Sequence, residues 1–194
     1  MSKRFTIAIV LLLAAPLCLK AQASESAARE QEEYAVYSAV IPPTYQHDES
    51  GILVIANPTW RYPNEISRND LRFIYPGSVV FQETLDDFIE RNKTNRWLER
   101  KFQLDFAYTL ADFAEIKRLT GQNPNSDWKD FLKRYPSSHG FVHYSRVGFN
   151  QRMDQALVYG GWACPYLCGY WEFILLEKNR RTWKVINLAN RVVS

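Results

Sequence analysis

Apolar side chains recur at helical spacing in the N-terminal half of the chain. Tyr34, Tyr37 and Ile41 fall on one helix face, which predicts an amphipathic helix over roughly residues 25–40. Further helix starts are expected at the Thr84-x-x-Asp87 box, at Asp112-x-x-Glu115 and at Ser126. Short strands are expected over 52–56 and 103–109. The N-terminal half is therefore expected to be rich in helix.

The last third of the chain has a strand pattern. Four apolar or alternating runs predict strands over 140–149, 154–163, 169–178 and 182–193. Only a few residues separate them, and connections that short join antiparallel neighbours. The third run is apolar on both faces, as a central strand is. We predict an α+β fold, with a helix-rich N-terminal half packed on a mostly antiparallel sheet and a C-terminal four-strand meander.

The N-terminus has the organisation of a secretory signal. Two basic residues precede an apolar run over 5–19, and Ala21-Gln22-Ala23 has the small-x-small pattern of a signal-peptidase site. The run is shorter than the ~20 apolar residues that a membrane span needs. A lipoprotein acylated at Cys18 is disfavoured because Leu17 stands where a small residue is expected. We predict that 1–23 is removed on export to the periplasm or the medium. This leaves a single globular domain over 24–194 and no membrane span.

The net positive charge of the chain belongs to its N-terminal segment. The whole chain has 24 Lys and Arg against 21 Asp and Glu, and residues 1–23 hold three basic residues and no acid. A neutral domain has no overall attraction for nucleic acid, so we expect no nucleic-acid partner. Common phosphate-binding, dinucleotide-binding and zinc-protease motifs are absent from the sequence, so we expect no cofactor. We interpret the acid pairs Glu32-Glu33 and Asp86-Asp87 as solvated or helix-starting residues.

Cys164 and Cys168 flank a short loop between two predicted strands. We interpret the pair as a disulfide, because export supplies an oxidising compartment and removal of 1–23 takes away the third cysteine. A redox centre is one alternative, although such pairs normally have C-x-x-C spacing at a helix N-terminus. A metal site is another, but it needs more ligands, and His139 and His143 would lie ~13 Å apart on an extended strand. We therefore expect no metal.

Six segments of the chain form a recognisable series: EEYAVYSAVI, LDDFIERN, YPSSHGFVHYSRVGFN, QALVYGGWACPYLCG, FILLEK and WKVI. In these segments the chain resembles a family of exported bacterial proteins with no assigned function. The sharpest signature is S-R-V-G-F-N, A-L-V-Y, the paired-cysteine loop, L-L-E-K and W-K-V. This chain departs from the family pattern with Pro165 after the first cysteine, where the family has glycine, and with its ending RVVS. The resemblance implies export and a common fold, but no reaction, substrate or cofactor.

Four aromatic residues in or beside the cysteine loop are the candidate binding residues: Trp162, Tyr166, Tyr170 and Trp171. Aromatic side chains are enriched at interface hot spots and also stack on sugars. The alternative is that Trp162 and Trp171 pack over the sheet as part of the core.

Two functional hypotheses follow. The leading one is an exported, non-catalytic binding domain whose partner is a protein or a glycan of the cell envelope. The alternative is a small secreted hydrolase with a site near His143 and Ser145, which share one face of a predicted strand. Exposed loop aromatics would favour the first, and a pocket joining these two side chains to a carboxylate would favour the second. The sequence assigns neither an enzyme activity nor an oligomeric state.

Overall fold

Seven strands form one mixed sheet in the described part of the chain. The computed structural model describes residues 24–41, 51–62, 66–121, 128–165 and 168–193. The strand order is β2-β1-β3-β5-β6-β7, and β4 also pairs with β5. The strands are Leu53–Asn57 (β1), Tyr108–Asp112 (β2), Phe141–Tyr144 (β3), Gly148–Phe149 (β4), Gln155–Ala163 (β5), Tyr170–Asn179 (β6) and Thr182–Val193 (β7). The helices are the N-terminal helix over 24–41, η1 (Arg68–Asp70), α2 (Gln82–Arg91), α3 (Phe113–Thr120) and α4 (Lys129–Arg134).

The sheet is parallel at one edge and antiparallel over the rest. β1 pairs in parallel with β2 and with β3, whereas β3–β5, β4–β5, β5–β6 and β6–β7 are antiparallel pairs. The α+β class is therefore confirmed, but the prediction of a mostly antiparallel sheet omitted the parallel edge. Parallel strands require long connections, and the pattern of short links in the last third gave no sign of them. The strand expected over 103–109 lies later, at β2.

The run over 140–149 forms two strands instead of one. β3 and β4 both pair with β5, and Ser145 to Val147 separate them. In this gap the side chain of Asn92 accepts from the amide of Arg146 at 2.9 Å and donates to its carbonyl at 3.0 Å. Because Asn92 takes the place of a strand partner, the backbone can leave the ladder here. The other three strands expected in the meander are present.

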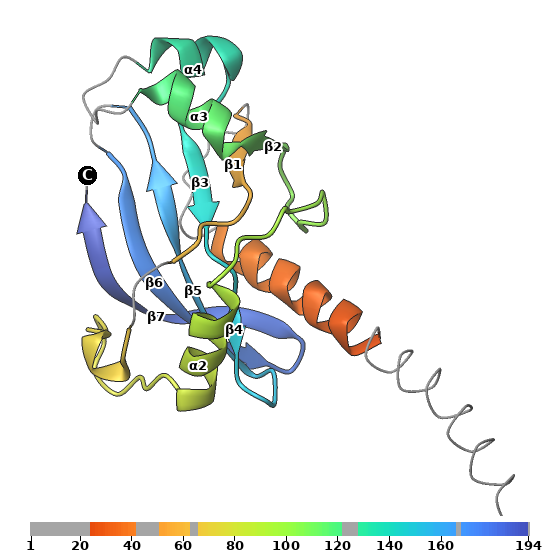
Figure 1. Cartoon of the computed structure of the whole chain (residues 1–194), viewed down its shortest axis with the longest axis vertical. Coiled ribbons are helices and arrows are strands. Elements are labelled where there is room, and N and C mark those ends of the chain that lie inside the picture. The colour runs from red at the N-terminus through yellow and green to blue at the C-terminus, as the bar shows by residue number, and fades with distance from the viewer. Residues whose placement is uncertain (1–23, 42–50, 63–65, 122–127, 166–167, 194) are drawn as a thin grey trace, which may run out of the picture.

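Helices cover both faces of the sheet. The N-terminal helix lies on one face, where Tyr37 is fully buried with Val142 and Tyr144 of β3. On the other face, Phe88 of α2 and Phe131 of α4 are fully buried in two further clusters. Burying a Phe side chain in this way contributes about 1.5–3 kcal/mol. Figure 1 shows α3 and α4 together at one end of the molecule and α2 towards the other.

The predicted helix starts have different outcomes. Asp112 caps α3, since its side chain accepts a backbone amide at 2.8 Å. Thr84 does not cap α2, because the helix begins before it. Its hydroxyl donates instead to Gln155 of β5 at 3.1 Å, which ties the helix to the sheet. The start expected at Ser126 lies outside the described residues.

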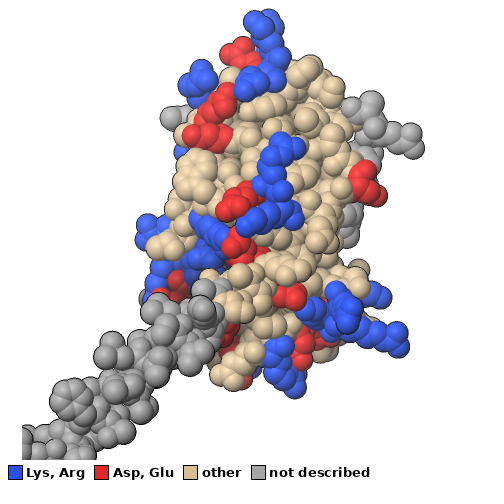
Figure 2. All heavy atoms as spheres, turned by 90° about the vertical axis from the view of Figure 1, so that its right-hand side faces the viewer, with Lys and Arg blue, Asp and Glu red and all other residues tan. Residues whose placement is uncertain are grey.

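The export predicted from the sequence can be compared with the structure only in part. The segment 1–23, with its predicted cleavage site, lies outside the described residues. Among the residues that the structure does describe, no helix is both long and apolar enough to cross a membrane. On the face seen in Figure 2, acidic and basic side chains lie interleaved, in keeping with the equal numbers of the two charges in 24–194.

Candidate binding site at the stapled end of the sheet

A disulfide closes the loop between β5 and β6. Cys164 and Cys168 are bonded, and their Cα atoms lie 5.6 Å apart. Cys164 is buried at the end of β5, whereas Cys168 is exposed. The predicted disulfide is therefore present. It joins the ends of two neighbouring central strands.

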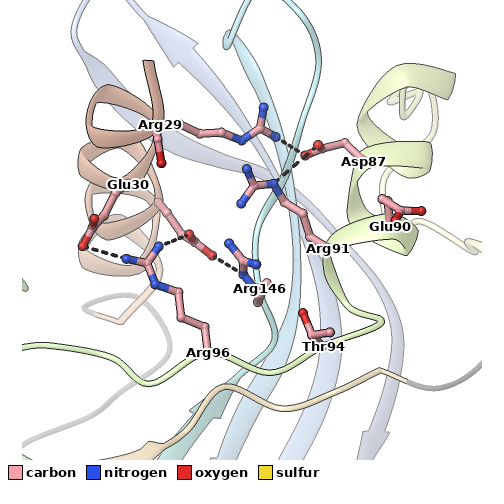
Figure 3. A pocket seen from close by; sticks show the side chains of 10 residues that line it. Arg29, Glu30, Asp87, Glu90, Arg91, Thr94, Arg96 and Arg146 are labelled. Carbon is pink, nitrogen blue, oxygen red and sulfur yellow. Dashed lines mark hydrogen bonds and ion pairs between the residues drawn. The ribbon is translucent and has the colours of Figure 1, made fainter. Parts of the chain in front are cut away.

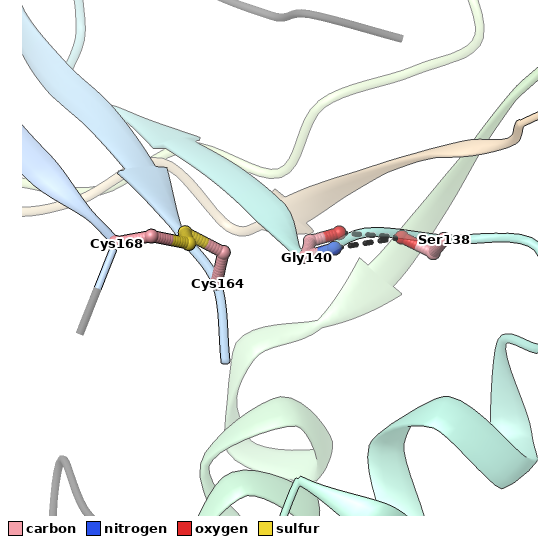
Figure 4. Close-up of a disulfide and its surroundings, with 4 residues drawn as sticks. All are labelled: Ser138, Gly140, Cys164 and Cys168. Atoms are coloured by element: carbon pink, nitrogen blue, oxygen red, sulfur yellow. Dashed lines mark hydrogen bonds between the residues drawn. A yellow bond between two sulfur atoms is a disulfide. The ribbon is translucent and has the colours of Figure 1, made fainter. Parts of the chain in front are cut away.

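The turn before β3 lies against this loop (Figure 4). The hydroxyl of Ser138 donates to the carbonyl of Gly140 at 2.6 Å. Gly140 has a φ of +147°, and a Cβ at this position would clash with the carbonyl of Ala163 and lie 3.0 Å from the Cα of Cys164. Only glycine permits so close an approach with this backbone conformation. The neighbouring strand thus helps to fix the position of the disulfide.

Three side chains form a row across β5, β6 and β7 beside the disulfide. Trp162 pairs with Tyr170, and Tyr170 pairs with Val193. Directly paired residues project their side chains from the same face of a sheet. Trp162 and Tyr170 are partly buried, whereas Val193 is 71% exposed. We call the surface formed by these three residues the stapled face.

Arg191 restrains the central ring of the stapled face. Its guanidinium lies 4.8 Å from the centre of the Tyr170 ring and donates to both carboxylate oxygens of Glu172, at 2.7 and 3.1 Å. The hydrogen bond to Glu172 raises the pKa of Arg191 above its ordinary value. Because the Glu172 side chain is fully buried, one end of this bidentate pair is anchored in the sheet. Tyr170 of β6 is therefore held in place by Arg191 of β7, which Glu172 of β6 positions in turn.

Trp171 lies on the opposite face. Its ring makes an edge contact with Trp60 at 4.8 Å and packs on the cluster beneath α3 and α4. Its partner in β7, Val192, is 60% exposed. The sheet therefore separates the aromatic residues predicted as one set, with Trp171 on one face and Trp162 and Tyr170 on the stapled face. Trp162 also packs on a core cluster, the one beneath the N-terminal helix, as the alternative interpretation expected. Tyr166, the fourth, lies outside the described residues.

His143, a residue of the alternative hydrolase site, is enclosed by aromatic rings. It is 1% exposed, its ring centre lies 4.2 Å from that of Phe113, and its ring stacks on Trp60 at 5.4 Å. Its Nε2 lies 2.8 Å from the carbonyl of Pro58, which it can only approach as a donor. Burial lowers the pKa of His143 to about 4. Such a side chain is neutral at pH 7 and a weak general base.

Ser145, the other residue of that site, is bonded to backbone groups. Its hydroxyl donates to the carbonyl of Arg146 and accepts from the amide of Tyr159, both at 2.9 Å. The residue is fully buried. Among the described residues, no carboxylate contacts His143 and no partner reaches its Nδ1. Both side chains are thus engaged in contacts that hold the fold, and within the described ranges no group is placed to activate the hydroxyl.

The two histidines considered as metal ligands have different environments. His139 is exposed, whereas His143 is buried in β3. Cys164 and Cys168 are bonded to one another, and a disulfide offers no thiolate to a metal ion. In the described ranges, no group of three or more His, Cys, Asp or Glu side chains is placed to hold a metal. The structure therefore favours the staple over the metal site.

Sequence reasoning missed the contribution of β7 to this site. The run over 182–193 was predicted as a strand, but the pairing of Val193 with Tyr170 depends on a register shift in β7 between Ala189 and Val192. No local pattern specifies such a shift. The clustering of aromatic residues around the cysteines was the only available signal.

Comparisons of this chain with protein-family models, with curated proteins and with solved structures found no match.

Proposed function

We propose that this chain is an exported, non-catalytic binding domain that contacts a protein of the cell envelope through the stapled face. The observation that carries the proposal is the row of Trp162, Tyr170 and Val193 beside the disulfide. A disulfide that closes so short a loop is typical of an oxidising compartment, which supports a periplasmic or extracellular location. The resemblance to a family of exported bacterial proteins supports the same location.

The composition of the stapled face favours a protein over a glycan as partner. Protein interfaces are enriched in aromatic residues and arginine. Here Tyr170 lies under Arg191, and the exposed end of the row is an aliphatic side chain, Val193. An aliphatic side chain offers a sugar neither a stacking surface nor a hydrogen bond, whereas it can fill an apolar pocket of a protein. The restrained ring also loses little freedom on binding.

Site-specific photocrosslinking in the native host tests the proposal. A photoreactive amino acid at Val193 should crosslink to one defined envelope protein, and Tyr170→Ala should reduce that product at least about tenfold if the ring is a hot spot. The matched control is Val79, which is 58% exposed and lies outside the stapled face. Equal crosslinking from both positions, or none from Val193, would contradict the proposal. A product that a glycosidase digests would assign the face to a glycan instead.

A further inference from the structure

A charged pocket lies between the N-terminal helix and α2 (Figure 3). Its volume is about 410 Å³. Four arginines from three parts of the chain line it: Arg29, Arg91, Arg96 and Arg146. Figure 3 shows the guanidinium groups of Arg29, Arg91 and Arg146 directed towards one another across the pocket. Cations so close together require anions between or beside them.

Arg96 is fully committed to the protein. One of its terminal nitrogens lies 2.7 Å from Glu30 and the other 3.2 Å from Glu33, and both acids belong to the N-terminal helix. Glu33 also accepts the Tyr37 hydroxyl at 3.2 Å and the amide of Val147 at 3.3 Å. These contacts fasten the helix to the rest of the domain. Both terminal nitrogens of Arg96 are therefore engaged by acids of the protein, so we do not assign Arg96 to a ligand.

The other three arginines share too few acids. Asp87 binds Arg29 and lies 3.5 Å from Arg91, and it also accepts the amide of Phe149 at 2.8 Å. Arg146 lies 3.5 Å from Glu33, which Arg96 already engages. Glu90 also lines the pocket, but its carboxylate is 71% exposed and binds Lys93. With Glu90 committed to Lys93, the four guanidinium groups share the carboxylates of Glu30, Glu33 and Asp87, and a positive charge is left over.

Three hydrogen-bond donors in the pocket are also left over. The Nε atoms of Arg29, Arg91 and Arg146 are buried and have no hydrogen-bond partner among the described residues. The ion pairs at 3.5 Å are too long or too poorly aligned to serve as such partners. Burial, with the charges of Arg29 and Arg146, lowers the pKa of Arg91. A buried donor without a partner costs about 1–3 kcal/mol, so the protein itself leaves these three guanidinium groups incompletely satisfied.

We propose that Arg29, Arg91 and Arg146 form a binding site for a phosphate group. An anion with several acceptor oxygens would neutralise the excess charge and accept from the three guanidinium groups that line the pocket. Arginine suits phosphate because its planar fork of donors matches two oxygens at a time. A tetrahedral phosphate can meet three guanidinium groups that come from different directions, whereas a planar carboxylate offers only two oxygens. The remaining volume, with the hydroxyls of Ser26 and Thr94 in its lining, has room for a molecule that carries the phosphate.

Calorimetric titration of the mature domain with inorganic phosphate tests this site. We expect saturable binding of one phosphate per chain, with no comparable signal from chloride at equal ionic strength. The same titration with glycerol 3-phosphate distinguishes the sources of the group. Tighter binding would indicate a phosphate carried on a larger molecule, and equal binding would indicate free phosphate. No saturable phosphate binding, or equal binding of acetate, would overturn the proposal.

Two variants separate the site from the general charge of the surface. Arg91→Gln should weaken phosphate binding at least about tenfold, because a hydrogen bond to a charged group contributes about 1.5–3 kcal/mol. Lys101→Gln is the control, because it removes a cation that pairs with Glu30 of the N-terminal helix, whereas Lys101 itself does not line the pocket. It should bind phosphate as the wild type does. If Arg91→Gln does not fold, Arg29→Gln takes its place, and equal losses in variant and control would contradict the site.

Discussion

Glu33 and Arg96 form an ion pair at 3.2 Å between residues that lie 63 positions apart in the chain. The carboxylate of Glu33 is almost completely removed from solvent, at 2% exposure, whereas the guanidinium of Arg96 is 27% exposed. Glu33 also contacts Arg146 at 3.5 Å and accepts the hydroxyl of Tyr37. One acid of the N-terminal helix therefore connects that helix to the loop after α2 and to the segment between β3 and β4.

Replacing Glu33 by alanine should lower the free energy of unfolding by about 3–5 kcal/mol. The reason is that the change leaves buried donors, and a share of two arginine charges, without an acceptor. Urea unfolding followed by circular dichroism measures the loss. The control is Glu90→Ala, since that side chain is 71% exposed and its ion pair with Lys93 should contribute no more than about 1 kcal/mol. A loss below about 1 kcal/mol for Glu33→Ala would show that the network contributes little to stability.

The stability of the domain should fall as the pH decreases from 6.5 towards 4. Burial lowers the pKa of His143 from 6.5 to about 4 in the folded state. Within this window the unfolded chain binds a proton that the folded chain does not, so acid favours unfolding. At 1.36 kcal/mol for each pH unit, the contribution of this group is about 3 kcal/mol, and it levels off below pH 4.

A difference between variants isolates this histidine from the carboxylates that also titrate in acid. His143→Gln removes the titrating ring, so the free energy of unfolding, measured in urea at pH 7 and pH 4, should change less than in the wild type. His139→Gln is the matched control, because that residue is exposed and its replacement should leave the wild-type dependence intact. If His143→Gln and the wild type lose the same stability, the buried ring does not titrate in this range.

Local sequence patterns predicted the helices and strands better than they predicted which strands pair in the sheet. The helix over 24–41 and strands β5, β6 and β7 follow from apolar periodicity, which depends only on near neighbours in the chain. The capping role of Asp112 was predictable for the same reason. The parallel pairing of β1 with β2 and β3 joins segments that are far apart in sequence, so no local signal announced it.

In the candidate sites, too, features formed by near neighbours in the chain were predicted and features formed by distant residues were not. The paired cysteines lie four positions apart and were correctly predicted to bond, because their separation is local. Glu33 was interpreted as a solvated or helix-starting acid. That interpretation was wrong, because the residue is buried within the helix and its partners come from distant segments. The arginine pocket escaped prediction altogether, since Arg29, Arg91 and Arg146 share no motif and meet only in the fold. Sites assembled from distant residues require the structure.

The disulfide should make a modest contribution to the stability of the domain. Replacing Cys164 and Cys168 together by serine should lower the free energy of unfolding by ~2 kcal/mol, the chain-entropy value for so small a ring, while the fold survives. We expect the larger core, not the ring, to carry most of the stability, because Phe173 to Leu176 of β6 are buried outside the loop. Urea unfolding of the double variant measures the change.

The same double variant also tests whether the staple orders the stapled face for binding. If it does, crosslinking from Val193 should fall by a larger factor than the small rise in unfolded protein can explain, since Trp162 and Tyr170 lose their fixed positions. Reduced wild-type protein is the control for the serine side chains and should behave like the variant. Thiol titration of the denatured, unreduced protein over residues 24–194 checks the premise directly. Two free thiols per chain in protein isolated from the native host would show that the staple is not formed there and that the stapled face lacks the rigidity proposed for it.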